Sequence, residues 1–137
     1  MIAVNDYYQN PVFWFSSDQL IEALEAIKLG KQNEIEIIKE KIKQFEQKRR
    51  SHEVWYQSLS PVRKFFAGRP PVHHQAVEYL VNVKDRFQQI EQINRKIAEI
   101  NVLIQKIHAE SEMEQIVLAN DIIADLKRWV EQGGITE

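Results

Sequence analysis

The chain has 137 residues, of which 44% are apolar and 28% are charged, and its formal net charge is -2. Such a composition indicates one folded, helix-permissive domain and excludes a disordered chain. The absence of cysteine excludes structural disulfides, cysteine-ligated metal sites and a thiol nucleophile. The apolar runs are too short for a transmembrane segment and the first residues lack the pattern of a secretory signal, so we expect a cytoplasmic protein.

Residues 1–16 form an aromatic leader that carries Tyr7, Tyr8, Phe13, Trp14 and Phe15. We expect these side chains to pack in the core at one end of a helical bundle, and the alternative is an exposed binding epitope. Ser16 followed three residues later by Gln19 fits a capping box. The sequence therefore predicts that a helix begins at about residue 17.

A first long helix is predicted over residues 17–59. After Gly30, apolar side chains recur in alternating steps of three and four residues, the seam period of a coiled coil, at Ile35, Ile38, Ile42 and Phe45. Before Gly30 the apolar stripe lies at a different angle about the helix axis, since Ile27 and Ile35 are eight residues apart. Two alternatives stay open, a helix that is bent or broken at Gly30 and one that continues through it.

Residues 60–73 are predicted to form an elbow, because the prolines and glycine of this segment disfavour helix. Residues 39–75 contain nine Lys and Arg against three Glu, a local charge of +6. Basic side chains interleaved with aromatic ones favour contact with a polyanion or an anionic surface. We predict a partner-binding surface formed by Arg49, Arg50, Arg63, Lys64, Phe65, Phe66 and Arg69. In the alternative interpretation, the two phenylalanines only plug the open end of the bundle.

A second long helix is predicted over residues 74–132, and a tail over residues 133–137 begins with two glycines. The seam of this helix repeats isoleucine in steps of three and four, at Ile90, Ile93, Ile97, Ile100, Ile104 and Ile107. From Met113 onward the apolar stripe widens, which indicates burial on more than one side.

These elements predict an all-α fold without a sheet, a single domain over residues 1–137. The elbow would fold the chain into a long antiparallel, coiled-coil-like helical hairpin, with acidic termini at one end and the basic elbow at the other. One hairpin buries too little apolar surface to be secure alone. We expect a homodimer in which the isoleucine seam of residues 90–107 joins two hairpins into a helical bundle. The alternative is that the helices bend back into a compact bundle.

The sequence contains no catalytic or metal-binding pattern. His73 and His74 are adjacent, so on a helix their side chains diverge by about 100° and do not chelate one ion as an i, i+4 pair does. The pair of Glu-x-x-His motifs of di-iron bundles and a glycine-rich phosphate loop are both absent. We therefore expect no enzymatic activity, no cofactor and no metal.

Two classes of function remain. The first is a non-enzymatic coiled-coil interaction protein, an adaptor or regulator that binds a protein partner whose identity the sequence does not reveal. The alternative is a nucleic-acid or anionic-surface binder that acts through the basic, aromatic elbow. An isoelectric point of about 6.1 favours the first class, because nucleic-acid-binding modules are usually basic overall.

Overall fold

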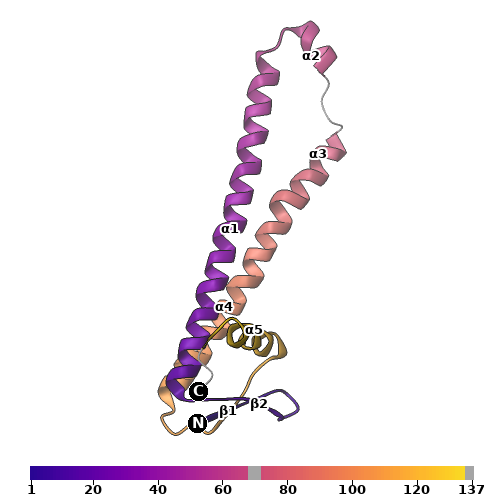
Figure 1. Ribbon diagram of the computed structural model, residues 1–137. Helices are drawn as coiled ribbons and strands as arrows, with labels where there is room; N and C mark the ends of the chain where they lie inside the picture. Colours follow the sequence, from indigo (N-terminus) through magenta and orange to yellow (C-terminus); the bar gives the residue numbers. More distant parts are fainter. Residues whose placement is uncertain (68–71, 135–137) are drawn as a thin grey trace. The chain divides into compact units, whose positions relative to one another are not determined.

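The computed structural model describes residues 1–67 and 72–134, without the side chains of Phe65, Val72, His73, His74 and Ala76. Helices dominate the described residues, as the apolar spacing predicted, but a small sheet is also present (Figure 1). In chain order the elements are β1 (Ile2–Asn5), β2 (Pro11–Phe15), α1 (Ser17–Ser58), α2 (Pro61–Ala67), α3 (Val72–Tyr79), the π-helical turn η1 (Leu80–Lys84), α4 (Asp85–Ala109), β3 (Gln115–Val117) and α5 (Asn120–Glu131).

The chain divides into two compact units. Unit 1 comprises Met1–Gln32 and Arg95–Glu137, and therefore contains the sheet, the first part of α1, most of α4 and α5. Unit 2 is Asn33–Asn94, with the rest of α1, α2, α3, η1 and the first part of α4.

The expectation of a fold without a sheet is wrong, because the leader and a segment near the C-terminus form three strands in the order β2-β1-β3. β1 and β2 pair antiparallel, with Ile2 opposite Phe15, and β1 and β3 pair parallel, with Val4 opposite Ile116. The turn between β1 and β2 is stabilised by the Asp6 carboxylate, which accepts hydrogen bonds of 2.9 Å from the backbone N–H groups of Tyr8 and Asn10. The leader is therefore a β-hairpin.

The core of unit 1 lies between the sheet and the three helices. Its fully buried members include Ile2, Val4 and Phe15 from the sheet, Leu20 and Leu24 from α1, Ile100 from α4 and Leu126 from α5. The expectation that the leader aromatics are core residues holds for Phe15, and Phe13 packs against the same core. It is wrong for Tyr7, Tyr8 and Trp14, which are exposed because they lie in the turn or on the opposite face of β2 from Phe13 and Phe15.

The start of α1 confirms the predicted capping box. The backbone N–H of Gln19 donates to Ser16 Oγ at 3.1 Å, and the backbone N–H of Ser16 donates to Gln19 Oε1 at 3.0 Å. A helix break at Gly30 is wrong, since α1 runs without interruption through this residue. Gly30 is exposed, and a Cβ atom at this position would meet nothing within 4 Å. The glycine therefore weakens the helix slightly without ending it.

The single helix expected over residues 74–132 is replaced by a series of shorter elements. The helical stretch that begins with α3 ends at Ala109, and the wide apolar stripe after Met113 belongs to β3 and α5. Ile116 and Leu118 alternate toward the core as a strand does, whereas Ile122, Ile123 and Leu126 form one face of α5. The apolar stripe after Met113 is wide because it combines the two-residue period of a strand with the 3.6-residue period of a helix.

Unit 2 has a thin core. Of its described residues, the buried apolar side chains are Ile35 and Ile42 on α1, Val83 in η1 and Ile90 on α4. The predicted elbow contains α2, whose first residue, Pro61, has the backbone angle a helix needs at this position. Ser60 caps α2, because its Oγ accepts a 3.3 Å hydrogen bond from the backbone N–H of Arg63.

Candidate interaction surface

The predicted partner-binding residues that the structure describes all belong to unit 2. Arg49 and Arg50 lie near the end of α1, whereas Arg63, Lys64 and Phe66 lie on α2. Arg69 and the Phe65 side chain are outside the described residues. Phe66 is 80% exposed, so the interpretation that it plugs a bundle is wrong for this residue.

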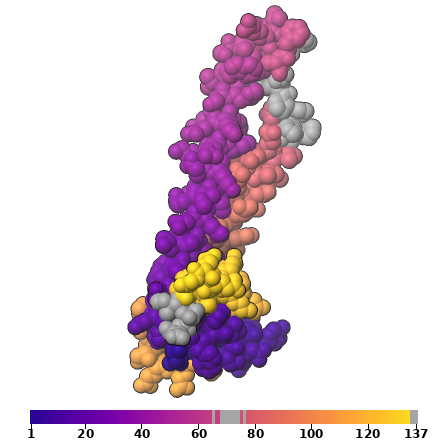
Figure 2. All heavy atoms as spheres, viewed as in Figure 1, coloured from indigo at the N-terminus to yellow at the C-terminus, as the bar shows by residue number. Residues whose placement is uncertain are grey.

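Lys64 connects helix α2 to the last turns of α1. Lys64 Nζ donates a 3.2 Å hydrogen bond to Gln57 Oε1 and lies 5.6 Å from the centroid of the Tyr56 ring. On the same helix, the rings of His52 and Trp55 are 5.5 Å apart. These contacts bring Lys64 of α2 against Tyr56 and Gln57 near the end of α1. In Figure 2 the atoms of these segments, in magenta, lie at the surface.

The cations of this region differ in how they are neutralised. Arg49 is 3.5 Å from the carboxylate of Glu46, and its guanidinium lies 5.9 Å from the centroid of the Tyr79 ring. Within the described part of the chain, three other side chains form no ion pair or hydrogen bond; we call Lys48, Arg50 and Arg63 the unpaired cations. The surface therefore retains positive charge that unit 2 does not use internally.

Four large apolar side chains on the same two helices are exposed, and we call Val54, Trp55, Val62 and Phe66 the apolar patch. Val62 and Phe66 are four residues apart and so share one face of α2. Exposed single apolar residues are ordinary on protein surfaces, so these four side chains become informative only through the cations on the same two helices.

A second exposed apolar group follows α3 into the π-helical turn. Val77, Leu80 and Val81 are spaced i, i+3, i+4, and each is at least 44% exposed; we call them the exposed stripe. In the π turn, the Asn82 side chain donates a 2.9 Å hydrogen bond to the backbone oxygen of Glu78. Single π turns are frequent at functional sites. The stripe has the spacing with which one helix packs against another.

The isoleucines predicted to join two chains are used inside the protomer. Ile100, Ile104 and Ile107 are buried in the core of unit 1, and Ile90 is buried in unit 2. Ile93 and Ile97 are half-buried. The buried isoleucines therefore already have neighbours within the chain, whereas the exposed stripe and the apolar patch belong to the apolar side chains that a second chain could reach.

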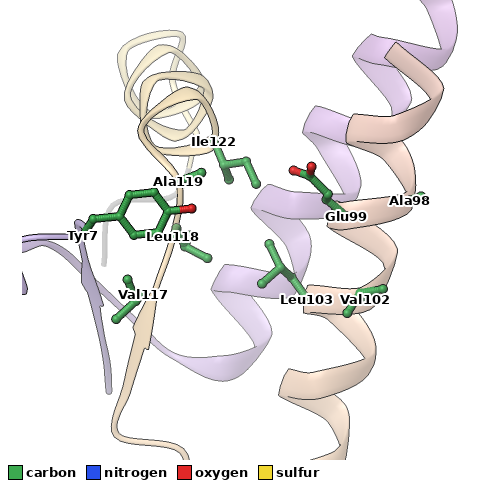
Figure 3. Close-up of a pocket in the computed structure, with 9 residues that line it drawn as sticks. All are labelled: Tyr7, Ala98, Glu99, Val102, Leu103, Val117, Leu118, Ala119 and Ile122. Carbon is green, nitrogen blue, oxygen red and sulfur yellow. The ribbon is translucent and has the colours of Figure 1, made fainter. Parts of the chain in front are cut away.

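Unit 1 contains an open cavity of about 430 Å³ between β3, α4 and the start of α5 (Figure 3). Its walls are mostly aliphatic, from Val102, Leu103, Val117 and Ile122, with the phenol of Tyr7 and the carboxylate of Glu99 as its ionisable groups. Glu99 lies 3.5 Å from Lys96 Nζ. Among the lining residues there is no nucleophile paired with a base, so the cavity lacks the parts of a hydrolytic or transfer site.

Two ion pairs connect α5 to the other helices of unit 1. Lys31 Nζ on α1 is 3.1 Å from the Asp125 carboxylate, and Lys96 on α4 pairs with Asp121. The hydrogen bond between Lys96 and Asp121 raises the pKa of the lysine and lowers the pKa of the aspartate. Both shifts favour the charged pair, so these groups have a structural role in fastening α5.

The described residues contain no group of three or more histidine, aspartate or glutamate side chains placed to hold a metal ion. None of the helices within these residues combines the length and hydropathy needed to cross a bilayer. No protein-family model, curated protein or solved structure shows significant similarity to the chain.

Proposed function

We propose that this protein is a non-enzymatic interaction protein, an adaptor or regulator, and that unit 2 carries its binding surface. The observation that supports this proposal is the exposed apolar residues of unit 2 together with the unpaired cations beside them. Leaving so many large apolar side chains in water is unfavourable, and a partner that covers them would gain the corresponding free energy.

The first expected partner is a protein helix that packs on the exposed stripe. A second copy of the chain satisfies the same geometry and would form a homodimer. The antiparallel hairpin proposed from the sequence is supported by two contacts, one in each unit. In unit 1, Lys28 Nζ donates a 3.1 Å hydrogen bond to Asn101, and in unit 2 Arg49 lies over Tyr79. Within each unit the contact brings α1 against a later helix of the chain, as the proposed hairpin requires.

Affinity capture from extracts of its native cells, with the full chain as bait, tests whether it binds a protein partner. The double variant Val77→Ser/Val81→Ser should lose the captured protein, whereas Leu29→Ser, an equally exposed apolar residue of unit 1, should retain it. Sedimentation equilibrium of the purified proteins then shows whether the partner is a second copy. Equal capture by the wild type and the double variant would exclude the exposed stripe as the binding surface.

A second candidate function, contact with a nucleic acid or another anionic surface, is supported by the unpaired cations. Such contacts weaken as the salt concentration rises, because released counterions contribute much of the binding free energy. Repeating the capture with nuclease present, and with Arg50→Ser/Arg63→Ser, separates this candidate from the first. Nuclease-resistant capture that the arginine variant retains would contradict the second candidate.

A further inference from the structure

We propose that the last turns of α1 together with α2 dock on the surface of an anionic lipid bilayer, with the apolar patch entering the interfacial layer. This inference rests on the second candidate function, since both use the unpaired cations, but it names the partner and adds the apolar side chains that a bilayer would cover.

The apolar part of this surface is built from two helices that a side-chain contact fixes together. Val62 and Phe66 project from one face of α2 and are 66% and 80% exposed. Lys64 lies on the opposite face of α2 and contacts Gln57 and Tyr56 on α1. The contact therefore turns the face of Val62 and Phe66 away from α1, so these two side chains can enter a lipid layer together. Tryptophan with aliphatic and phenylalanine side chains is the combination that interfacial helices insert at headgroup depth.

The charges of this segment have the sign and position that an anionic headgroup layer requires. Residues 47–67 contain five Lys and Arg and a single acidic residue, Glu53. Arg63 lies directly beside Val62, and Arg50 precedes Val54 by one helical turn. Both arginines belong to the unpaired cations, so approaching an anionic lipid does not require breaking an ion pair within the described residues. Basic side chains next to a membrane are attracted by its negative surface potential.

The aliphatic members of the patch favour a bilayer over a nucleic acid. Bases stack on aromatic rings and pair with polar groups, so Val54 and Val62 would gain little from a nucleic acid. A cavity of about 570 Å³ in unit 2 is lined by residues that include Lys48, Arg50 and Gln75, but by none of the four patch residues. Val62 and Phe66, which are 66% and 80% exposed, project into solvent. An outward apolar group fits a deformable hydrocarbon layer, and the contact would be peripheral.

Co-sedimentation of the full chain with vesicles tests the proposal. We expect binding at low salt to mixed phosphatidylcholine and phosphatidylglycerol vesicles and much weaker binding to phosphatidylcholine alone. Val62→Ser/Phe66→Ser should weaken binding to the anionic vesicles at least about tenfold, since two apolar side chains no longer enter the layer. Arg50→Ser/Arg63→Ser should also weaken it and reduce its dependence on salt. Val102→Ser, which changes a similarly exposed residue of unit 1, is the matched control.

Tryptophan fluorescence supplies an independent measurement. Adding anionic vesicles should shift the emission to shorter wavelength, and the shift should persist in Trp14→Phe but disappear in Trp55→Phe. Trp14 is exposed in unit 1, so it reports any non-specific adsorption of that unit. Far-UV circular dichroism checks that each variant keeps its helix content.

The outcomes separate the inference from the proposed function. The full chain remaining in the supernatant with anionic vesicles at low salt would overturn the bilayer contact, as would unchanged vesicle binding by Val62→Ser/Phe66→Ser. If the chain does not bind anionic vesicles, but affinity capture is nuclease-sensitive and depends on Arg50 and Arg63, the anionic partner is a nucleic acid and the second candidate function stands. If the chain does not bind anionic vesicles and the Val62→Ser/Phe66→Ser or Arg50→Ser/Arg63→Ser variant loses a captured protein, the surface binds a protein.

Discussion

Of the described apolar residues, fifteen are buried in unit 1 and four in unit 2. The units differ because unit 1 has a sheet, two long helices and α5 around one core, whereas the described core of unit 2 has side chains from only α1, η1 and α4. A side chain is enclosed only when it has neighbours on several sides, and two adjoining helical stretches leave most of their surface in water. Unit 1 therefore contains most of the enclosed core, whereas unit 2 exposes the apolar and basic side chains that we propose as a binding surface.

The largest effect is expected from a charge placed in the core of unit 1. Ile100 is fully buried on α4, so Ile100→Glu should destabilise the protein by about 4 kcal/mol or more, because an unpaired carboxylate is removed from water. Chemical denaturation followed by circular dichroism measures this loss. Val102→Glu, two residues along the same helix and exposed, is the control and should change stability by less than about 0.5 kcal/mol.

The second prediction compares the two cores by removing side-chain volume. Leu126→Ala in unit 1 should cost about 3 kcal/mol, because rigid neighbours on every side leave a cavity. Ile42→Ala in unit 2 should cost about 1 to 2 kcal/mol, since its surroundings are open and can relax. Denaturation midpoints of the two variants give the comparison. Equal losses would show that the core of unit 2 is as tightly enclosed as that of unit 1.

The third prediction concerns the start of α1 in unit 1. Ser16→Ala should destabilise the protein by about 1 kcal/mol, because the backbone N–H of Gln19 loses its acceptor. Gln19→Ala should cost less, and the two losses should not add fully, since both residues belong to the same capping box. Thermal unfolding of the single and double variants measures the coupling. Additive losses would contradict a reciprocal cap.

The smallest effect is expected from the ion pair between Lys96 and Asp121, because both side chains are partly exposed to solvent. The pKa of Asp121 is lower in the folded chain than its ordinary value of 3.8, so the carboxylate contributes stability above pH 3.8 and loses it as the pH falls through the folded pKa. Asp121→Asn should therefore be less stable than the wild type near pH 7 by under about 1 kcal/mol. In denaturation experiments at acidic pH the difference should vanish; a difference independent of pH would exclude the ion pair as its cause.

Local sequence patterns determined much of the helical structure. The three-and-four spacing of Ile35, Ile38 and Ile42 predicted α1 after Gly30, and Ser16 with Gln19 predicted its start. The basic, aromatic composition around α2 also indicated where charge and exposed aromatic groups would gather. These features could be predicted because helix hydrogen bonds and caps join residues three or four positions apart.

Only the tertiary structure decided the sheet and the distribution of burial. Ala3 pairs with Gln115 across more than a hundred residues, so neither strand is specified by its own short segment. The same non-local packing buries Ile100 and Ile104 but leaves Val77 and Val81 exposed, although all four lie in apolar helical patterns. Spacing shows which residues share a helix face, but the elements that cover the face determine whether it is core or binding surface.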